Sequence, residues 1–386
     1  MNTTSVFHER GRPSRPENLS RSEKRPRITV DARLIQASGI GTYLSNLLPR
    51  LVGARPGWHF TLLGIPDQLR ECGWALTPNV TIVPCDALIY GIAEQIQLAT
   101  RIPADTDLVW SPHYNIPLTY RGRLLVSIHD VCHVALPQLV KGVHRRAYTR
   151  VMLNQVKRRA SRILFPSEFT AGEFRRLVGE TGSKAATVHY GVSPRWFEVR
   201  PVERPHSRPY ILFVGNVKPH KNLGTLIQAF GSIAGRIPHD LVIVGKHSGF
   251  ITGDSPAVTV ATALGDRVQF TGKVAAEMLE QFVVHADALV LPSLYEGFGL
   301  PPLEAMACGC PTIVSRAGSL PEMCGDASLY FDPTNSDELA STLLRVLSSQ
   351  QIQQDLRVRG RRHAARYSWH SCAEKTLGFL EQLALP

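Results

Sequence analysis

The sequence has no apolar run long enough to cross a bilayer. No stretch approaches the roughly 18 residues that a membrane-spanning helix needs. Residues 1–27 are polar and rich in Arg, Ser and Pro, and they lack the apolar segment of a signal peptide. We therefore expect a disordered basic tail over 1–27 and a cytoplasmic protein.

Cysteines are few, and they are scattered. Seven cysteines, an odd number in 386 residues, are typical of reduced thiols in a cytosolic protein. Cys308 and Cys310 flank a single glycine, but no histidine or second close pair accompanies them. Asp105 and Asp107 form an acidic pair that precedes an apolar run instead of following one, so we interpret it as a loop. These patterns predict no metal site.

Basic residues outnumber acidic ones in the first half of the chain only. Residues 1–200 contain 27 lysines and arginines against 15 acids, whereas residues 201–386 contain 16 against 17. A basic half beside a neutral half indicates an anionic partner for the first half only. An anionic membrane surface and nucleic acid are the two candidates, and a solvated basic face is the alternative without a partner. We find no RNA- or DNA-binding motif, so the prediction is a membrane surface and no nucleic acid.

Short apolar runs alternate with longer segments that favour helices, which is typical of βα units and parallel sheets. The runs are Ile28–Asp31, His59–Leu63, Val80–Pro84, Leu108–Trp110, Leu124–His129, Ile163–Pro166, Thr187–His189, Tyr210–Gly215, Leu241–Gly245, Val268–Thr271, Leu289–Leu291, Thr312–Ser315 and Leu329–Phe331. Residues 194–209 contain four prolines among charged residues, so we expect an interdomain linker there. The fold class is thus α/β, with Rossmann-like domains over 28–193 and 210–368 that face a cleft.

The clearest helix pattern follows the first apolar run. Its apolar residues recur at helical spacing and define one face: Ile40, Tyr43, Leu44, Leu47, Leu48 and Leu51. Gly39 and Gly41 begin this segment like a dinucleotide fingerprint, but Leu44 stands where the third glycine would be. A lone pair of glycines is weak support for NAD binding.

The second half contains two glutamates eight residues apart around a glycine-bearing loop. Glu296-Gly297-Phe298-Gly299-Leu300 follows an apolar run and leads into helix-favouring residues that include Glu304. A helix N-terminus carries unpaired N–H groups and partial positive charge, which suit a phosphate. The two carboxylates suit sugar hydroxyls instead, as in a nucleotide sugar. A tight turn with two solvated acids is the alternative from spacing alone.

Glu-Gly-Phe-Gly-Leu-Pro followed by a second Glu resembles the E-x7-E element of family 4 (group 1) retaining glycosyltransferases of GT-B fold. The resemblance covers nearly everything from Ile28 to Leu385. It implies that Glu296 lies near the donor hexose and Glu304 on the ribose. The loop residues Gly297, Phe298, Gly299 and Leu300 would then face the diphosphate.

The resemblance also assigns roles outside this loop. Gly41 matches the glycine loop under the donor diphosphate, and His129 matches a histidine that contacts the donor sugar, with Asp130 orienting its ring. Lys221 matches the phosphate-binding lysine, although Asn216 and His220 stand where the family usually has arginines. The family's last helix crosses back onto the first domain, which residues 369–386 would do here. The catalytic residues predicted in this way are His129, Glu296 and Lys221.

The segments Trp110–Tyr114 and Tyr90–Gln95 resemble the mannosyl- and rhamnosyltransferase branch, where they border the acceptor. The expected function is hexose transfer, mannose from GDP-mannose, onto a saccharide acceptor that is lipid-linked, in bacterial surface polysaccharide synthesis. No cofactor or metal is expected, and the protein would associate with the inner face of the plasma membrane. A sugar-nucleotide epimerase of the same fold, and less favoured a basic nucleic-acid-binding protein, are the alternatives.

Overall fold

The computed structural model describes residues 25–139, 142–246 and 256–385. The predicted tail over 1–27 therefore lies outside the described residues except for its last three. Arg27 already belongs to the first strand, so the first domain begins one residue before the predicted boundary at Ile28. Within the described residues, no helix combines the length and apolar character that crossing a membrane requires.

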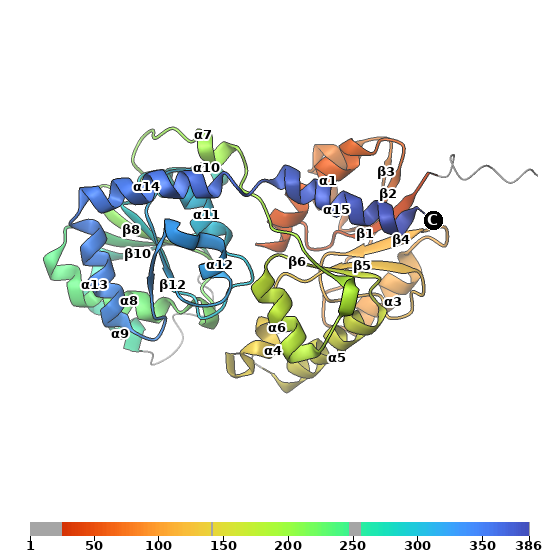
Figure 1. Ribbon diagram of the computed structural model, residues 1–386, viewed down its shortest axis with the longest axis horizontal. Helices are drawn as coiled ribbons and strands as arrows, with labels where there is room; N and C mark the ends of the chain where they lie inside the picture. The colour runs from red at the N-terminus through yellow and green to blue at the C-terminus, as the bar shows by residue number, and fades with distance from the viewer. Residues whose placement is uncertain (1–24, 140–141, 247–255, 386) are drawn as a thin grey trace, which may run out of the picture.

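Two parallel sheets form the centres of two domains that lie side by side (Figure 1). The first has the order β3-β2-β1-β4-β5-β6-β7 and the second β10-β9-β8-β11-β12-β13. The strands are β1 Arg27–Asp31, β2 His59–Gly64, β3 Val80–Pro84, β4 Leu108–Ser111, β5 Arg123–Ser127, β6 Arg162–Phe165, β7 Ala185–Thr187, β8 Tyr210–Val214, β9 Asp240–Val244, β10 Val268–Gly272, β11 Ala288–Leu291, β12 Thr312–Ser315 and β13 Leu329–Phe331. The predicted fold class is confirmed.

Helices cover both faces of each sheet. The strands are largely apolar because both of their sides are buried. The helices are α1 Ile40–Ala54, α2 Pro66–Arg70, α3 Ile92–Arg101, α4 Cys132–Ala135, α5 Val143–Arg159, α6 Glu168–Val178, α7 Arg195–Glu198, α8 Leu223–Ile233, α9 Pro256–Leu264, α10 Ala276–Val284, α11 Leu300–Ala307, α12 Leu320–Cys324, α13 Ser336–Leu347, α14 Gln350–Ala364 and α15 Trp369–Ala384. The apolar face predicted after the first strand is the buried face of α1.

Two strand predictions are displaced from the observed strands. The run Leu124–His129 was expected to place His129 at a strand end, but β5 stops at Ser127. The chain turns there because the Asp130 carboxylate accepts a hydrogen bond from the Cys132 N–H at 2.9 Å, which begins α4. The run Thr187–His189 is shifted by two residues from β7, Ala185–Thr187, and shares only Thr187 with it.

The linker contains a short helix, contrary to the expectation that its prolines would exclude one. Pro194 precedes α7 at its N-cap, a position where the missing N–H costs nothing. Just before it, Val192 donates a backbone hydrogen bond of 3.0 Å to Tyr367, so the linker lies against the chain's return crossing. A Cβ on Gly191 would come 1.9 Å from the backbone nitrogen of Trp369, so only glycine fits this contact.

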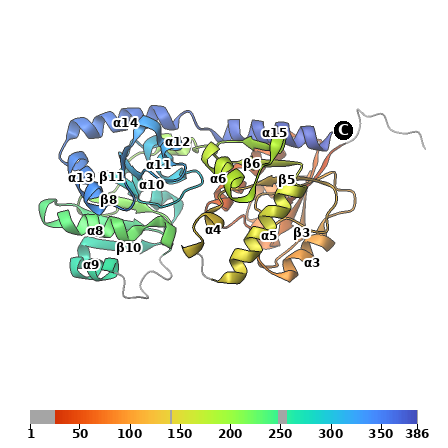
Figure 2. The same ribbon diagram turned by 60° about the horizontal axis from the view of Figure 1, so that its bottom comes forward.

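The C-terminal helix α15 crosses back onto the first domain, where it packs against α1, β4 and β5 (Figures 1 and 2). Leu377, Leu380 and Ala384 form its buried face. Trp369, at its start, stacks on Tyr190 with ring centres 5.8 Å apart. Tyr190 also contacts Phe298 of the second domain at 4.8 Å, so aromatic rings join both domains at the crossing.

Candidate functional site

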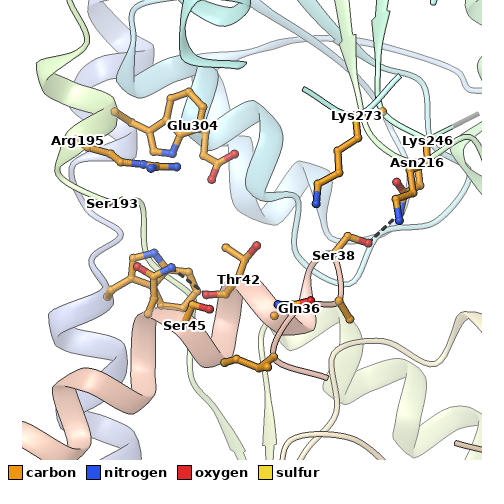
Figure 3. A pocket seen from close by; sticks show the side chains of 17 residues that line it. Gln36, Ser38, Thr42, Ser45, Ser193, Arg195, Asn216, Lys246, Lys273 and Glu304 are labelled. Carbon is orange, nitrogen blue, oxygen red and sulfur yellow. Dashed lines mark hydrogen bonds between the residues drawn. The ribbon is translucent and has the colours of Figure 1, made fainter. Parts of the chain in front are cut away.

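A cavity of about 750 Å³ lies between the domains, at the carboxyl ends of the parallel strands (Figure 3). Its first-domain wall is the loop after β1 and the start of α1, including Gly41 and Thr42. Its second-domain wall includes Asn216, Lys246 and Glu304. Ligands of open α/β sheets bind at this edge, so the cavity is the candidate site.

Of the predicted site residues, Glu304 is directly in the cavity. Its carboxyl is half-buried on α11 and accepts a hydrogen bond from Trp196. Burial raises the pKa of Glu304 to about 7, because the nearby Arg195 guanidinium only partly offsets the loss of hydration. Arg195 is itself paired with Glu280 at 3.2 Å. Glu304 thus combines a hydrogen-bonding role with a protonation state that changes near neutral pH.

Gly41 also lines the cavity, as predicted, but a contact within the first domain is what requires a glycine at this position. A Cβ there would come 2.4 Å from the backbone oxygen of Ile35 in the preceding loop. The absence of a side chain lets this loop fold back onto the first turn of α1. The Gly41 backbone and the Thr42 side chain consequently face the second domain across the cavity.

Lys221 and Glu296 form an ion pair in the second domain, and neither is among the residues that line the cavity. The Lys221 ammonium donates to a Glu296 carboxylate oxygen at 2.6 Å, and Ser293 donates to the same oxygen at 2.5 Å. Both charged side chains are mostly buried. Lys221 follows β8 and Glu296 follows β11, which are neighbours in the sheet, so the pair lies at the point where strand order reverses.

Asn222 positions Lys221. It adopts the left-handed conformation, with φ of 54°, and its side-chain amide donates to the carbonyls of Pro292 at 3.0 Å and Pro333 at 2.7 Å. These hydrogen bonds join the loop after β8 to the loops after β11 and β13. The lysine is therefore held by three strand ends of the second sheet.

The glycine loop does not face the cavity in the way the sequence predicts. Gly297, Phe298 and Gly299 are buried, and Phe298 packs among aromatic rings. Helix α11 begins at Leu300, but Pro301 and Pro302 occupy its next two positions and have no N–H groups to offer. Fewer amides than expected are thus available to a phosphate at this helix start.

Gly297 is instead a contact between the domains. A Cβ on Gly297 would come 2.0 Å from the backbone oxygen of His129. Its carbonyl accepts hydrogen bonds from Ser167 at 2.6 Å and Thr170 at 3.0 Å, both at the start of α6. The domains therefore meet backbone to backbone at this loop.

Glu322 of the second domain strengthens the same contact. Its carboxylate accepts from the backbone N–H groups of Glu168 and Phe169, each at 2.9 Å, at the N-terminus of α6. Burial acts to raise the pKa of Glu322, but the nearby His189 ring, at 3.5 Å, and these two backbone N–H groups lower it overall. A carboxylate from one domain thus caps a helix of the other.

His129 has both ring nitrogens engaged. Its Nε2 donates to the Pro112 carbonyl at 2.7 Å, so Nδ1 accepts the hydroxyl hydrogen of Tyr190. Burial lowers the pKa of His129 to about 4, which keeps the ring neutral. The expectation that Asp130 orients the ring is wrong, because that carboxylate starts α4 instead. A sugar contact by His129 stays a prediction.

Sequence reasoning missed Lys246 and Lys273, which both line the cavity, and the Lys273 side chain points into it (Figure 3). Each follows a glycine at the carboxyl end of a strand, β9 and β10 respectively. A Gly-Lys pair directly after an apolar run was the signal that could have identified them. Asn216, in the place of the missing arginine, reaches across to donate to Ser38 of the first domain at 2.8 Å.

The acidic pair Asp105 and Asp107 lies at the opposite end of the first sheet. Asp105 pairs with Arg27 at 3.0 Å, and Asp107 accepts the Arg27 N–H at 3.0 Å. Both contacts join the start of β4 to the start of β1, far from the strand ends that form the cavity. In the part of the chain that the structure describes, no group of three or more metal-ligating side chains is assembled.

Comparisons with known proteins find relatives that are named as glycosyltransferases. Residues 194–363 match the family described as "Glycosyl transferases group 1". The chain is 29% identical over 279 residues to O-antigen chain mannosyltransferase B of Escherichia coli, covering 69% of this chain and 72% of that protein. It is 30% identical over 249 residues to the MMP alpha-(1->4)-mannosyltransferase of Mycolicibacterium hassiacum, covering 63% and 59%. That second match spans less than two thirds of the relative's own length.

Solved structures share the two-domain architecture. Sucrose-phosphate synthase from Thermosynechococcus elongatus superposes with a TM-score of 0.74 at 20% identity, over 93% of this chain and 99% of that chain. Anabaena HepE in complex with UDP and glucose superposes with a TM-score of 0.72 at 18% identity, over 93% and 100%. At such identities the likeness concerns the fold, which is GT-B.

Replacing Gly297 by alanine should separate the domains. The new methyl group would meet the His129 carbonyl, and overpacking of this kind costs about 1–3 kcal/mol. Small-angle X-ray scattering should show a larger radius of gyration than for the unaltered protein. Gly53→Ala is the matched control, since a Cβ there meets nothing within 4 Å. An unchanged radius for Gly297→Ala would contradict this account of the domain contact.

Nucleotide affinity should rise with pH through Glu304. Hydroxyl donors prefer the ionised carboxylate, which predominates above its pKa of about 7 and is lost as the pH falls. A single such group changes affinity by about tenfold between pH 6 and pH 8. Calorimetric titrations with a nucleoside diphosphate should show this change for the unaltered protein and not for Glu304→Gln. Equal pH profiles for the two proteins would refute the assignment.

Proposed function

This chain belongs to the group 1 glycosyltransferases of GT-B fold, and from that premise we propose that it is a retaining mannosyltransferase that uses GDP-mannose. We propose further that its acceptor is a lipid-linked saccharide of bacterial surface polysaccharide synthesis. The names of its relatives support mannose as the transferred sugar. Two of them are named as mannosyltransferases, O-antigen chain mannosyltransferase B and the MMP alpha-(1->4)-mannosyltransferase.

The observation that carries the proposal is the ion pair of Lys221 and Glu296 at the point where strand order reverses, together with Glu304 in the interdomain cavity. A nucleotide sugar needs a cation for its diphosphate and hydrogen-bond acceptors for the hydroxyls of two sugars. The second domain supplies Lys221 at the end of β8, Glu296 at the end of β11 and Glu304 on α11. We assign Lys221 to the diphosphate, Glu296 to the hexose and Glu304 to the ribose.

Lys221 must exchange its partner when the donor binds. In the structure its charge is neutralised by Glu296. A diphosphate oxygen would take the place of that carboxylate, and Glu296 would turn to the hexose hydroxyls while Ser293 still donates to it. The site keeps its cation paired before the donor arrives, which lowers the cost of a buried charge.

The chemistry is departure of the diphosphate from the anomeric carbon and attack by an acceptor hydroxyl from the same face. The carbon–oxygen bond to the phosphate breaks as the bond to the acceptor oxygen forms, and the acceptor proton passes to the departing phosphate. Lys221 stabilises the negative charge that develops on that phosphate. The ring of His129, neutral because of burial, would lie near the reacting sugar without adding positive charge.

The first domain carries a surface suited to an anionic membrane. Leu88, Ile92 and Ile96, on α3 and the loop before it, are 87%, 82% and 59% exposed, although the helix buries Glu94 and Leu98 on its other side. An apolar exposed face on an amphipathic helix is typical of interfacial binding.

One basic residue lies near these apolar side chains. The Arg145 guanidinium of α5 is 5.0 Å from the centre of the Tyr90 ring, and Tyr90 lies between Leu88 and Ile92 in the sequence. Tyr148 of the same helix donates to Glu94 of α3 at 2.9 Å, so the two helices are joined (Figure 2). Each basic residue near an anionic surface contributes about 1 kcal/mol. We propose that this face holds the protein on the inner surface of the plasma membrane.

Removing the charge of Lys221 or Glu296 should lower the rate of mannosyl transfer. Charge-assisted contacts are worth about 1.5–3 kcal/mol, so Lys221→Ala and Glu296→Gln should each reduce the rate constant roughly 10- to 150-fold. Transfer from radiolabelled GDP-mannose measures this. Asp105→Asn, at the far end of the sheet, is the matched control and should leave transfer unchanged.

The same assay tests the stereochemistry and the metal requirement. NMR of the product should show the donor's α-configuration retained, and EDTA should leave the activity intact. An inverted product, or activity lost with EDTA and restored by Mn²⁺, would contradict the mechanism. Release of free sugar epimers without any acceptor would identify an epimerase instead.

Charged substitutions on α3 should detach the protein from anionic vesicles. Burying one isoleucine side chain contributes about 1.5–3 kcal/mol, so Ile92→Asp with Ile96→Asp should weaken binding by at least about tenfold. Vesicle flotation at low and high salt measures this, and high salt should weaken binding of the unaltered protein too. Val358→Asp in the second domain, where the side chain is 58% exposed, is the matched control. Equal flotation of all variants would rule out this face.

A further inference from the structure

Three neighbouring strands of the second sheet end in the same way. Gly215 and Gly245 directly follow β8 and β9, Gly272 is the last residue of β10, and the next residues are Asn216, Lys246 and Lys273. The ends are in register, because Gly215 donates to Val244 and Gly245 donates to Gly272, each at 2.9 Å. Three polar side chains are thereby brought to one rim of the interdomain cavity.

Gly245, which follows the middle strand β9, has to be a glycine because the neighbouring strand end lies so close to it. A Cβ on Gly245 would come 2.1 Å from the backbone oxygen of Gly215. The close approach places Lys246 next to Asn216, and Val217 donates a backbone hydrogen bond of 2.9 Å to Lys246. The position of the lysine is thus set by backbone contacts and not by a partner for its charge.

Neither lysine is paired with a carboxylate in the part of the chain that the structure describes. Among the described residues, no carboxylate lies within ion-pair distance of Lys246 or Lys273. Two other cations near the site are paired, Lys221 with Glu296 and Arg195 with Glu280. Two ammonium groups that line a cavity are hydrogen-bond donors with no acceptor among the described residues. They can therefore bind a ligand that presents oxygen or nitrogen acceptors.

The order of strands indicates which part of the ligand they meet. The proposed sugar and diphosphate contacts, Glu296 and Lys221, lie at β11 and β8. Strands β9 and β10 are the next two on the side away from β11, about 5 and 10 Å from β8. A donor that runs from hexose through diphosphate and ribose would extend its base toward them.

We propose that Lys246 and Lys273 bind the base of the donor nucleotide and select a purine with a 6-oxo group. This inference rests on the proposed function. Guanine presents two adjacent acceptors, N7 and O6, on one edge, and lysine ammonium groups pair well with them. Adenine presents an amino donor in place of O6, which two further donors disfavour. Uracil presents only a single oxygen on the corresponding edge.

Four nucleoside diphosphates test the assignment by calorimetry: GDP, IDP, UDP and ADP. IDP retains N7 and O6 and lacks the 2-amino group, so the unaltered protein should bind it like GDP. ADP should bind roughly 5- to 150-fold more weakly than GDP. Lys246→Ala with Lys273→Ala should remove most of that preference, and each single change should remove part of it. Both side chains are exposed, so the variants should keep the fold, which circular dichroism checks.

Inorganic pyrophosphate is the probe that separates base from phosphate recognition. Its affinity should be the same for the double variant and the unaltered protein. Lys375→Ala, an exposed lysine of α15 outside the cavity, is the matched control and should keep the GDP preference. Equal weakening of pyrophosphate and all four nucleotides would overturn the inference, since the lysines would then bind phosphate. An unchanged GDP-to-ADP ratio in the double variant would overturn it while leaving the proposed function intact.

Discussion

The contact of Gly297 with the backbone of His129 brings the two domains to the separation at which the rest of the site forms. It is a meeting of main chains, so no side chain can adjust to relieve it. Hydroxyls of Ser167 and Thr170 bind the Gly297 carbonyl, and Glu322 caps the same helix from the other domain. Because an interior packs as densely as a crystal, a single methyl group at this point would change the spacing of the whole cleft.

Charge in the site is divided between two kinds of cation. Lys221 is mostly buried and paired with Glu296, and it is held by Asn222 at the reversal of strand order. Lys246 and Lys273 are exposed to the cavity, and each begins a loop at the end of an outer strand. A buried cation without a partner would be costly, whereas an exposed one is hydrated until a ligand replaces the water. The arrangement separates a cation suited to catalysis from cations suited to recognition.

The fold was predictable because its signals are local. Each of the thirteen apolar runs overlaps a strand, and the helical spacing from Ile40 to Leu51 is the buried face of α1. The errors are at boundaries, where local propensity competes with specific hydrogen bonds. The Asp130 carboxylate ends the extension of β5 before His129, and Pro194 starts a helix in a linker where prolines were expected to prevent one.

The sequence by itself predicted two parallel α/β domains and the linker region, because hydrophobic periodicity and proline placement act over a few residues. The family resemblance of its motifs predicted the crossover helix, which packs on the first domain, and the residues Glu304 and Gly41, which line the cavity. Only the tertiary structure decided that Gly297 is a domain contact, that His129 is held by Tyr190 and Pro112, and that Lys246 and Lys273 share a cavity with Glu304. Those facts depend on segments far apart in the chain, whose distance is set by how the two sheets face each other.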